Sequence, residues 1–276
     1  MTAPGPAAEG SAPRLLSPSQ INTYLACERK WWYQYIEHLP TTESFAQVRG
    51  TLVHALVEDL FGFEPHRGIT YPELIAQLRE RLLADFERRW VDEDIVGRFG
   101  EANHEQTRQM LLRFLQHLQW EMDPLYERYL DPIKVWRFTQ PSFRELDLVD
   151  AQLGLRGIID AVVDKGDEGV VLVDYKTSKV FMHPHSDEYE RQLYLYALLY
   201  ERLKKVRPAV VSVHYLLTGQ VANYPVREPF LQEAAQTVAT VQQGTTRTDK
   251  AQFVRNTGYR FCRYCDFYDH CMGDTP

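Results

Sequence analysis

The sequence predicts an α/β fold, with a mixed β-sheet core flanked by helices and a mainly helical region before it. Helix signals dominate residues 15–130. After residue 131, short β-branched and apolar runs alternate with helical segments, which is the pattern of a layered α/β domain. The composition is globular, with 44% hydrophobic residues, and no window approaches the roughly 18–20 apolar residues of a membrane span. We therefore expect no membrane association.

The N-terminal part begins with residues 1–14, which are rich in Ala, Pro and Gly and predict a flexible tail without a secretory signal. The first helix should start at Ser17, a good N-cap, with Pro18 in the first turn and Gln20 as its capping-box partner. Its buried stripe is predicted from helical spacing to be Ile21, Tyr24 and Leu25. Three further helices are expected at residues 45–61, 71–90 and 101–128.

The second half should contain the sheet. Strands are expected at residues 133–138, 152–163, 170–176, 210–217 and 221–226, and helices at 187–204 and 229–243. The turn-forming residues 166–169 make the second and third strands a hairpin. Because no repeat or linker is visible, we expect one domain over residues 15–276. It comprises a helical region (15–130), a core (131–250) and a Cys-rich segment (251–276).

The hairpin carries the strongest candidate site. Asp160 lies on its first strand, and Asp174 and Lys176 share one face of the second, because alternate residues of a strand point the same way. Asp174 follows an apolar run that predicts a buried strand, where charged groups are unfavourable unless they bind something. Carboxylate oxygens suit Mg²⁺ or Mn²⁺, which can activate water and offset phosphodiester charge. The alternative is a hairpin joined only by a salt bridge.

Two further features could belong to the same site. Gln192 and Tyr196 are four residues apart, so they share one face of the helix after the hairpin. They would face the site or the substrate backbone, or simply form the half-exposed side of an amphipathic helix. His54 is flanked by apolar residues, which is usual for a core histidine; its alternative role is a nitrogen ligand to the same metal.

The chain has four cysteines: Cys27, Cys262, Cys265 and Cys271. Without a secretory signal the expected compartment is reducing and cytoplasmic, so disulfides are the less favoured use of these thiols. Four thiolates are a complete ligand set for Zn²⁺ or for an iron–sulfur cluster, and spacing alone does not separate the two. Four unrelated buried thiols are the remaining alternative.

Five segments occur together in an order that resembles RecB-family nucleases of the PD-(D/E)xK superfamily. They are LSPSQINTYLACERKWWYQYI, GTLVHALVE, GIIDAVV, VDYKTSK and QLYLYA, and the resemblance spans about residues 15–273. It implies a restriction-endonuclease-like fold. Two of the segments are weak alone, but five in order form a specific signature. Ile159 stands where the family's name motif has proline before the first aspartate.

The resemblance also implies roles for individual residues. His54, Asp160 and Asp174 match metal-binding positions, and the backbone carbonyl of Tyr175 often completes the metal shell in this family. Lys176 matches the catalytic lysine. Gln192 and Tyr196 match a helix motif that contacts the site and DNA.

The cysteine layout, one early Cys and a C-terminal trio, is similar to the iron–sulfur branch of this family, which includes AddB-type and CRISPR-associated nucleases. This implies a structural 4Fe-4S cluster, with Zn²⁺ as the less favoured occupant. The implied activity is a Mg²⁺- or Mn²⁺-dependent DNA exonuclease acting on single strands or duplex ends, in repair, recombination or CRISPR adaptation. No Walker A motif occurs, so a helicase motor would be a partner. The alternative is a non-catalytic DNA-end-binding scaffold subunit.

Overall fold

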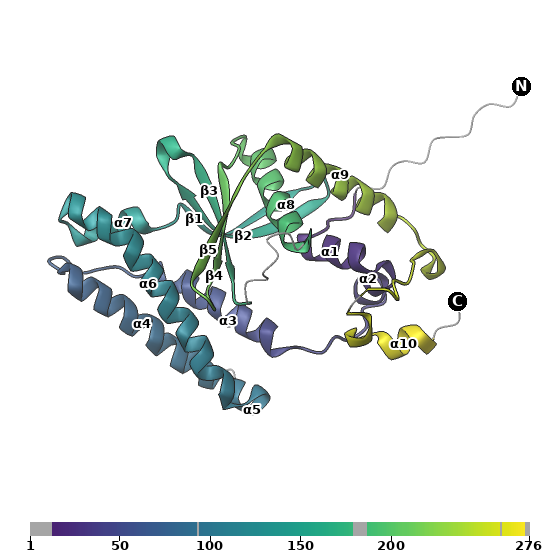
Figure 1. Cartoon of the computed structure of the whole chain (residues 1–276), viewed down its shortest axis with the longest axis horizontal. Helices are drawn as coiled ribbons and strands as arrows, with labels where there is room; N and C mark the ends of the chain where they lie inside the picture. The colour runs from purple at the N-terminus through teal and green to yellow at the C-terminus, as the bar shows by residue number, and fades with distance from the viewer. Residues whose placement is uncertain (1–12, 93, 179–186, 260, 274–276) are drawn as a thin grey trace, which may run out of the picture.

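The computed structural model describes residues 13–92, 94–178, 187–259 and 261–273, and is organised around one five-stranded sheet (Figure 1). The strands lie in the order β1-β2-β3-β4-β5. Only β3 and β4 are parallel; the other neighbours are antiparallel. The expected mixed sheet flanked by helices is confirmed. The strands are β1 (Phe143–Asp150), β2 (Leu155–Asp164), β3 (Val170–Lys176), β4 (Val210–Tyr215) and β5 (Gln220–Pro225).

Two groups of helices cover the two faces of this sheet. The core on one face is shared with α1 (Pro18–Ala26), α2 (Glu28–Tyr35), α8 (Asp187–Lys204) and α9 (Glu228–Thr245), and α2 packs on α1. The core on the other face is shared with α3 (Phe45–Leu60), α4 (Tyr71–Asp92), α6 (His104–Tyr129) and α7 (Pro132–Thr139), and α4 packs on α3 and α6. The described residues also include two short helices, α5 (Ile95–Phe99) and α10 (Tyr268–Gly273), and short 3₁₀ turns. Residues 1–12, most of the expected tail, lie outside it.

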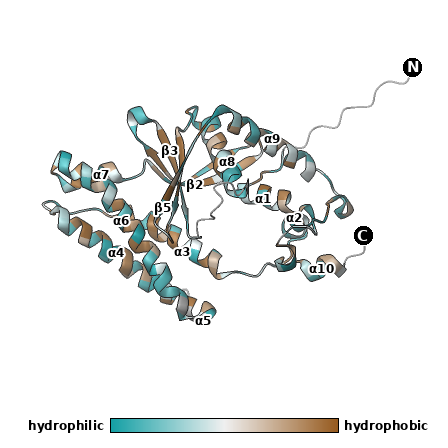
Figure 2. Ribbon diagram, in the orientation of Figure 1, coloured by the Kyte–Doolittle hydropathy of each residue, from teal (hydrophilic) through white to brown (hydrophobic). Residues whose placement is uncertain are grey.

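Successive side chains of a strand point to opposite faces of the sheet, so each strand contributes to both cores. On β3, Leu172 joins the core under α8, whereas Val173 and Tyr175 join the core under α3 and α6. Figure 2 shows the strands as the most hydrophobic ribbons and the outer helices as mixed. Among the described residues, no helix combines the length and the apolar character needed to cross a membrane.

The predicted start of the first helix is confirmed. The Ser17 side chain accepts a hydrogen bond from the Gln20 amide, and the Gln20 side chain accepts one from the Ser17 amide. Ile21 and Tyr24 are buried as predicted, but Leu25 is 40% exposed, so it is not part of the buried stripe. The chain takes an extended conformation at Cys27, which ends α1 and begins α2.

The strand predicted at residues 133–138 is wrong, because this segment is helix α7. Asp131 caps it by accepting hydrogen bonds from the amides of Ile133 and Lys134, and Pro132 occupies the first helical turn. These local signals outweigh two β-branched residues. The edge strand β1, which follows α7, was not predicted.

Candidate functional site

The site is located where β2 and β3 separate. Their ladder runs from Asp164↔Val170 to Ala161↔Val173 and stops there. Beyond it, side chains replace strand β2 as partners of the β3 backbone. The Asp160 carboxylate accepts a 2.6 Å hydrogen bond from the Tyr175 amide, and His54 Nε2 lies 2.8 Å from the Tyr175 carbonyl oxygen. The opened ladder therefore leaves polar groups converging at the end of β3.

Three potential ligands meet at this opening. His54, Glu145 and Asp160 each offer one ligand atom, and these atoms all lie within 4.8 Å of one another. His54 Nδ1 is 3.3 Å from Asp160 Oδ1. The β1–β2 register pairs residues 144 and 146 with 161 and 159, which places Glu145 opposite Asp160. Two carboxylates directly opposed on neighbouring strands repel each other unless a cation lies between them.

Glu145 was not identified from the sequence. It is held at φ 41°, in the left-handed region that a non-glycine residue rarely adopts, and such strain concentrates at functional sites. Its strand reads FRELDLVD, in which Leu146 and Leu148 alternate with charged residues. This alternation was the available signal for both β1 and Glu145.

Asp174 and Lys176 form a buried pair next to this group. The Lys176 ammonium lies 2.9 Å from both carboxylate oxygens of Asp174, to one of which it donates a hydrogen bond. The other oxygen, Oδ2, is buried and accepts no hydrogen bond. Asp174 is not a member of the close three-residue group, although it lies near enough to influence His54. A buried oxygen without a hydrogen bond, in a carboxylate that feels the charges of Asp160 and His54, fits a site for a hard divalent cation.

Helix α8 closes the other side of the site. Lys176 also donates to Gln192 Oε1 at 3.3 Å, and the Gln192 amide donates to the Tyr196 hydroxyl at 2.9 Å. Gly157 on β2 permits this close approach, because a Cβ there would lie 3.0 Å from the Tyr196 ring. The structure thus brings Lys176, Gln192 and Tyr196 into one chain of hydrogen bonds.

The electrostatics of the site favour cation binding. Burial alone would lower the pKa of His54, but the neighbouring Asp160 carboxylate, helped by the charges of Asp174 and Glu145, raises it to about 9. Burial raises the pKa of Asp174 and of Glu145, and Asp160 adds to both shifts. Burial opposes charge on Lys176 as well, yet Asp174 more than offsets this and raises the lysine pKa. Lys176 is therefore a cation at neutral pH.

The sequence matches the model of the PD-(D/E)XK nuclease superfamily over residues 15–272, nearly its whole length. The chain belongs to this superfamily. Membership implies a hydrolase that acts on nucleic acids, and superfamily members use divalent metals, in agreement with the donor set described above. It also implies that nucleic acid is a binding partner of this superfamily member.

A solved structure of another protein has the same fold at low sequence identity. A "Putative exonuclease" from Eubacterium rectale has 14% sequence identity and a TM-score of 0.57, over 96% of this chain and 89% of that one. The structure of SSO0001 has 14% identity and a TM-score of 0.31, over 83% of this chain and 98% of that one, which is too low to support an argument. No curated protein matched the sequence.

The four cysteines lie apart from the candidate metal site of this nuclease-superfamily chain. They are free thiols of intermediate exposure, and all four line one cavity of about 260 Å³. Among the described residues, no three cysteine sulfurs lie within 4.8 Å of one another, so they do not form a compact metal cage. The cavity lies between the α1–α2 junction and the C-terminal segment.

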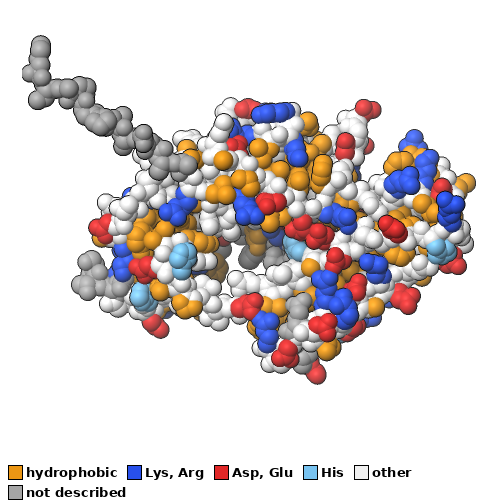
Figure 3. Space-filling model, turned by 180° about the vertical axis from the view of Figure 1, so that it is seen from behind, with side chains coloured by type: hydrophobic (Ala, Val, Ile, Leu, Met, Phe, Trp, Pro, Cys, Tyr) orange, Lys and Arg blue, Asp and Glu red, His pale blue; other side chains and the backbone are white. Residues whose placement is uncertain are grey.

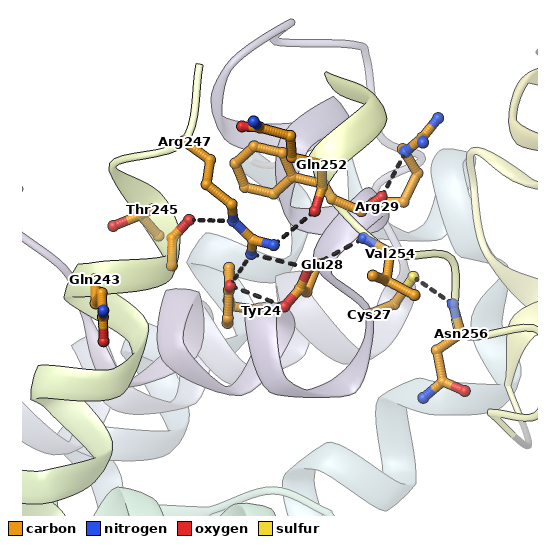
Figure 4. A network of polar contacts seen from close by, with 12 residues as sticks. Tyr24, Cys27, Glu28, Arg29, Gln243, Thr245, Arg247, Gln252, Val254 and Asn256 are labelled. Atoms are coloured by element: carbon orange, nitrogen blue, oxygen red, sulfur yellow. Dashed lines mark hydrogen bonds and ion pairs between the residues drawn. The ribbon is translucent and has the colours of Figure 1, made fainter. Parts of the chain in front are cut away.

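A polar network ties the same two segments together beside this cavity (Figure 4). Arg247 forms a 2.9 Å ion pair with Glu28 and hydrogen-bonds the Tyr24 hydroxyl. Glu28 also accepts a 3.0 Å hydrogen bond from the Val254 amide, and the Asn256 amide donates to the Cys27 sulfur at 3.5 Å. The first helices are thus held to residues 247–256 by contacts that do not involve a cofactor.

Proposed function

We propose that this protein is a Mg²⁺- or Mn²⁺-dependent DNA exonuclease of the RecB family that acts on single strands or duplex ends. The observation that carries the proposal is the convergence of His54, Glu145 and Asp160 beside the buried Asp174–Lys176 pair. The residues that would hold the metal are His54, Glu145, Asp160 and Asp174, together with the carbonyl of Tyr175. When bound, the metal supplies an activated water and offsets charge on the scissile phosphate.

The remaining roles belong to the side chains around the metal site. Asp174 keeps Lys176 a cation, and Gln192 accepts a hydrogen bond from it, so Lys176 acts as a fixed positive charge toward the phosphodiester and not as a general base. The Tyr196 hydroxyl accepts a hydrogen bond from the Gln192 amide and so fixes the position of the Gln192 oxygen that accepts from Lys176. In this proposal, both α8 residues contact a DNA backbone that enters over this face.

The test is cleavage of end-labelled DNA in Mn²⁺ or Mg²⁺ by the wild type, Lys176→Ala and Lys165→Ala. Lys165 is an exposed lysine of the same hairpin, outside the site, so it is a matched control. We expect wild type and K165A to cleave single strands alike, and K176A to lose at least about a hundredfold in rate. An inactive wild type, or an active K176A, would contradict the assignment of the site.

A panel of substrates decides the finer points of the proposal. Linear single strands, circular single strands, blunt duplexes and single-stranded RNA are compared under the same conditions. An exonuclease spares the circle, whereas cleavage of the circle would make the enzyme an endonuclease. Equal cleavage of RNA and DNA would remove the deoxyribonuclease assignment. Binding of DNA ends without cleavage of any substrate would instead indicate the scaffold subunit.

We propose that the four cysteines hold a 4Fe-4S cluster with a structural role. Support comes from the resemblance and from the single cavity that the four thiols line. A tetrahedral Zn²⁺ site with metal–sulfur bonds of about 2.3 Å needs sulfurs about 3.8 Å apart, and no three sulfurs of the described cysteines lie within 4.8 Å of one another. Iron and labile sulfide analysis with absorption spectroscopy on anaerobically purified protein tests this. Stoichiometric zinc without sulfide would replace the cluster proposal.

The charge distribution supports the proposal of a protein partner. The chain has a net charge of −7, and on the face in Figure 3 basic and acidic side chains are interspersed, with a local group of Lys and Arg at the end that carries α7. Modest intrinsic affinity for DNA is expected from such a surface. We therefore propose delivery of the substrate by a helicase, recombination or CRISPR partner in the cytoplasm. Tight, salt-sensitive binding to free single strands by the isolated chain would argue against it.

A further inference from the structure

We propose that Arg49 is a positioning residue for the proposed reaction, which holds the end of β3 that carries Lys176. The Arg49 guanidinium donates a 3.1 Å hydrogen bond to the carbonyl of Thr177, the residue directly after Lys176. It also donates at 2.7 Å to Gln106 Oε1 on α6. One side chain of α3 therefore joins α6 to the strand end where the candidate lysine lies.

Arg49 completes a regular pattern of contacts between α3 and the opened edge of β3. His54 contacts the carbonyl of Tyr175, and Arg49 contacts the carbonyl of Thr177, two residues further on. Alternate carbonyls of a strand point to the same side, so both contacts lie on the edge that β2 has left. On the opposite edge, the Lys176 carbonyl accepts a hydrogen bond from the Leu216 amide after β4. Lys176 is thus held from both sides of its strand.

The surroundings of Arg49 are unusual for a residue with only a packing role. The side chain is 9% exposed, and no carboxylate of the described residues lies within ion-pair distance of it. Its Nε is buried without a hydrogen-bond partner. The ring of Phe45, 5.2 Å from the guanidinium carbon, provides the remaining contact. A buried cation without a counter-ion is unfavourable for stability, so its position next to Lys176 points to a use at the site.

The physical consequence concerns the geometry of Lys176. Loss of the tie to Thr177 frees the last residues of β3 on the edge where the ladder has ended. Misplacement of a catalytic group by about 1 Å can lower a rate about a hundredfold, even when the altered residue does not touch the substrate. Arg49 should therefore affect turnover more than substrate binding.

The experiment compares Arg49→Met and Arg49→Lys with Arg113→Met. Arg113 is a matched control, because it lies on α6 and donates to the carbonyl of Leu217 just beyond the neighbouring strand β4. Hydrogen–deuterium exchange is measured for the segments 174–178 and 216–220. We expect R49M to raise exchange at least about tenfold in 174–178 only, and R113M to raise it in 216–220 only. Unchanged exchange in 174–178 would overturn the proposal.

Kinetics on end-labelled single-stranded DNA provide the second measurement. We expect R49M to lower kcat about ten- to a hundredfold with KM changed less than about threefold, R49K to recover part of kcat, and R113M to resemble wild type. Equal kcat for R49M and wild type, or an equal loss in R113M, would overturn the proposal. This arm rests on the proposed nuclease function. If the wild type does not cleave, that function fails, and the exchange measurement still decides whether Arg49 positions the strand end.

Discussion

Glu145 offers a test at the scale of a single residue. It faces Asp160 across the β1–β2 ladder, and burial and the Asp160 charge outweigh the nearby His54 imidazolium and raise the pKa of Glu145, so its charge is unfavourable in the metal-free protein. We expect Glu145→Gln to weaken Mn²⁺ binding at least about tenfold, because a charged oxygen ligand is lost. The same change should slightly stabilise the metal-free protein. Calorimetric Mn²⁺ titration and thermal unfolding in chelator measure the two effects.

The opposite signs of these two effects make the prediction specific. Asp147→Asn serves as the control, because Asp147 lies on the same strand but pairs with Arg156 at the surface. It should leave Mn²⁺ affinity unchanged. A Glu145 variant that bound Mn²⁺ as tightly as wild type would exclude this residue from the metal site.

The protonation of His54 gives a pH-dependent prediction. Its pKa of about 9 means that the imidazole is protonated at neutral pH, whereas a metal ligand must be neutral. Mn²⁺ binding should therefore release a proton at pH 7, and affinity should rise with pH until about pH 9. Titration calorimetry in buffers of different ionisation enthalpy measures the released protons. Affinity that is flat from pH 6.5 to 9 would show that His54 does not ligate the metal.

The protonation of His54 should also affect the stability of the metal-free protein, which should fall with rising pH while Mn²⁺ affinity rises. The folded pKa of His54 is raised above its ordinary value of 6.5, so its contribution is full below about pH 6.5 and is lost as pH rises through about 9. We expect the free energy of unfolding in chelator to fall across this window. His54→Gln should remove that part of the pH dependence.

At the scale of elements, the predictable parts were those with strong local signals. The hairpin was expected because β-branched and apolar runs lie on both sides of a turn with two glycines, and the structure pairs Asp164 with Val170 there. The way in which the candidate ligands meet across strands was harder to predict from the sequence. Glu145 faces Asp160 only because β1 pairs with β2 in one particular register. The edge strand β1 was not predicted from the sequence, and a strand was predicted where helix α7 precedes it. Long-range pairing therefore limited the prediction of the site more than residue chemistry did.

Helix α7 provides a prediction for its own element. Its start depends on the Asp131 side chain, which accepts hydrogen bonds from two backbone amides of the first turn. Asp131→Ala should lower the free energy of unfolding by about 1 kcal/mol, and the melting temperature by about 2–4 °C. Asp131→Asn, which can still cap the helix, should behave nearly like wild type. Both are measured by urea and thermal unfolding; equal loss in the two variants would mean that the charge, and not the cap, stabilises α7.

At the scale of the whole molecule, two distant segments meet at the cysteine cavity. Cys27 and Cys262 are 235 positions apart, so a link between them would constrain a very long loop, by on the order of 5 kcal/mol in a chain-entropy model. The structure already joins these segments through Arg247, Glu28 and Tyr24 (Figure 4). The spacing of the cysteines indicated a shared ligand set, but it gave no sign of this polar network.

This second link determines what loss of the cofactor should do. If the cysteines hold a cluster, its removal by oxidation and chelation should free only the chain beyond Asn256, because the Arg247–Glu28 contacts and the hydrogen bond from Asn256 to the Ala26 carbonyl remain. We expect trypsin to cleave at Arg263 while the sheet stays protected. Mn²⁺ affinity should change by less than about threefold, since the cavity at the cysteines shares no lining residue with the His54, Glu145 and Asp160 group. Proteolysis mapped by mass spectrometry, together with Mn²⁺ titration, measures both. Simultaneous loss of the folded sheet and of Mn²⁺ binding would show that the two sites form one cooperative unit. In that case, Arg247→Met should cause the same loss of folding and Mn²⁺ binding even with the cysteines intact.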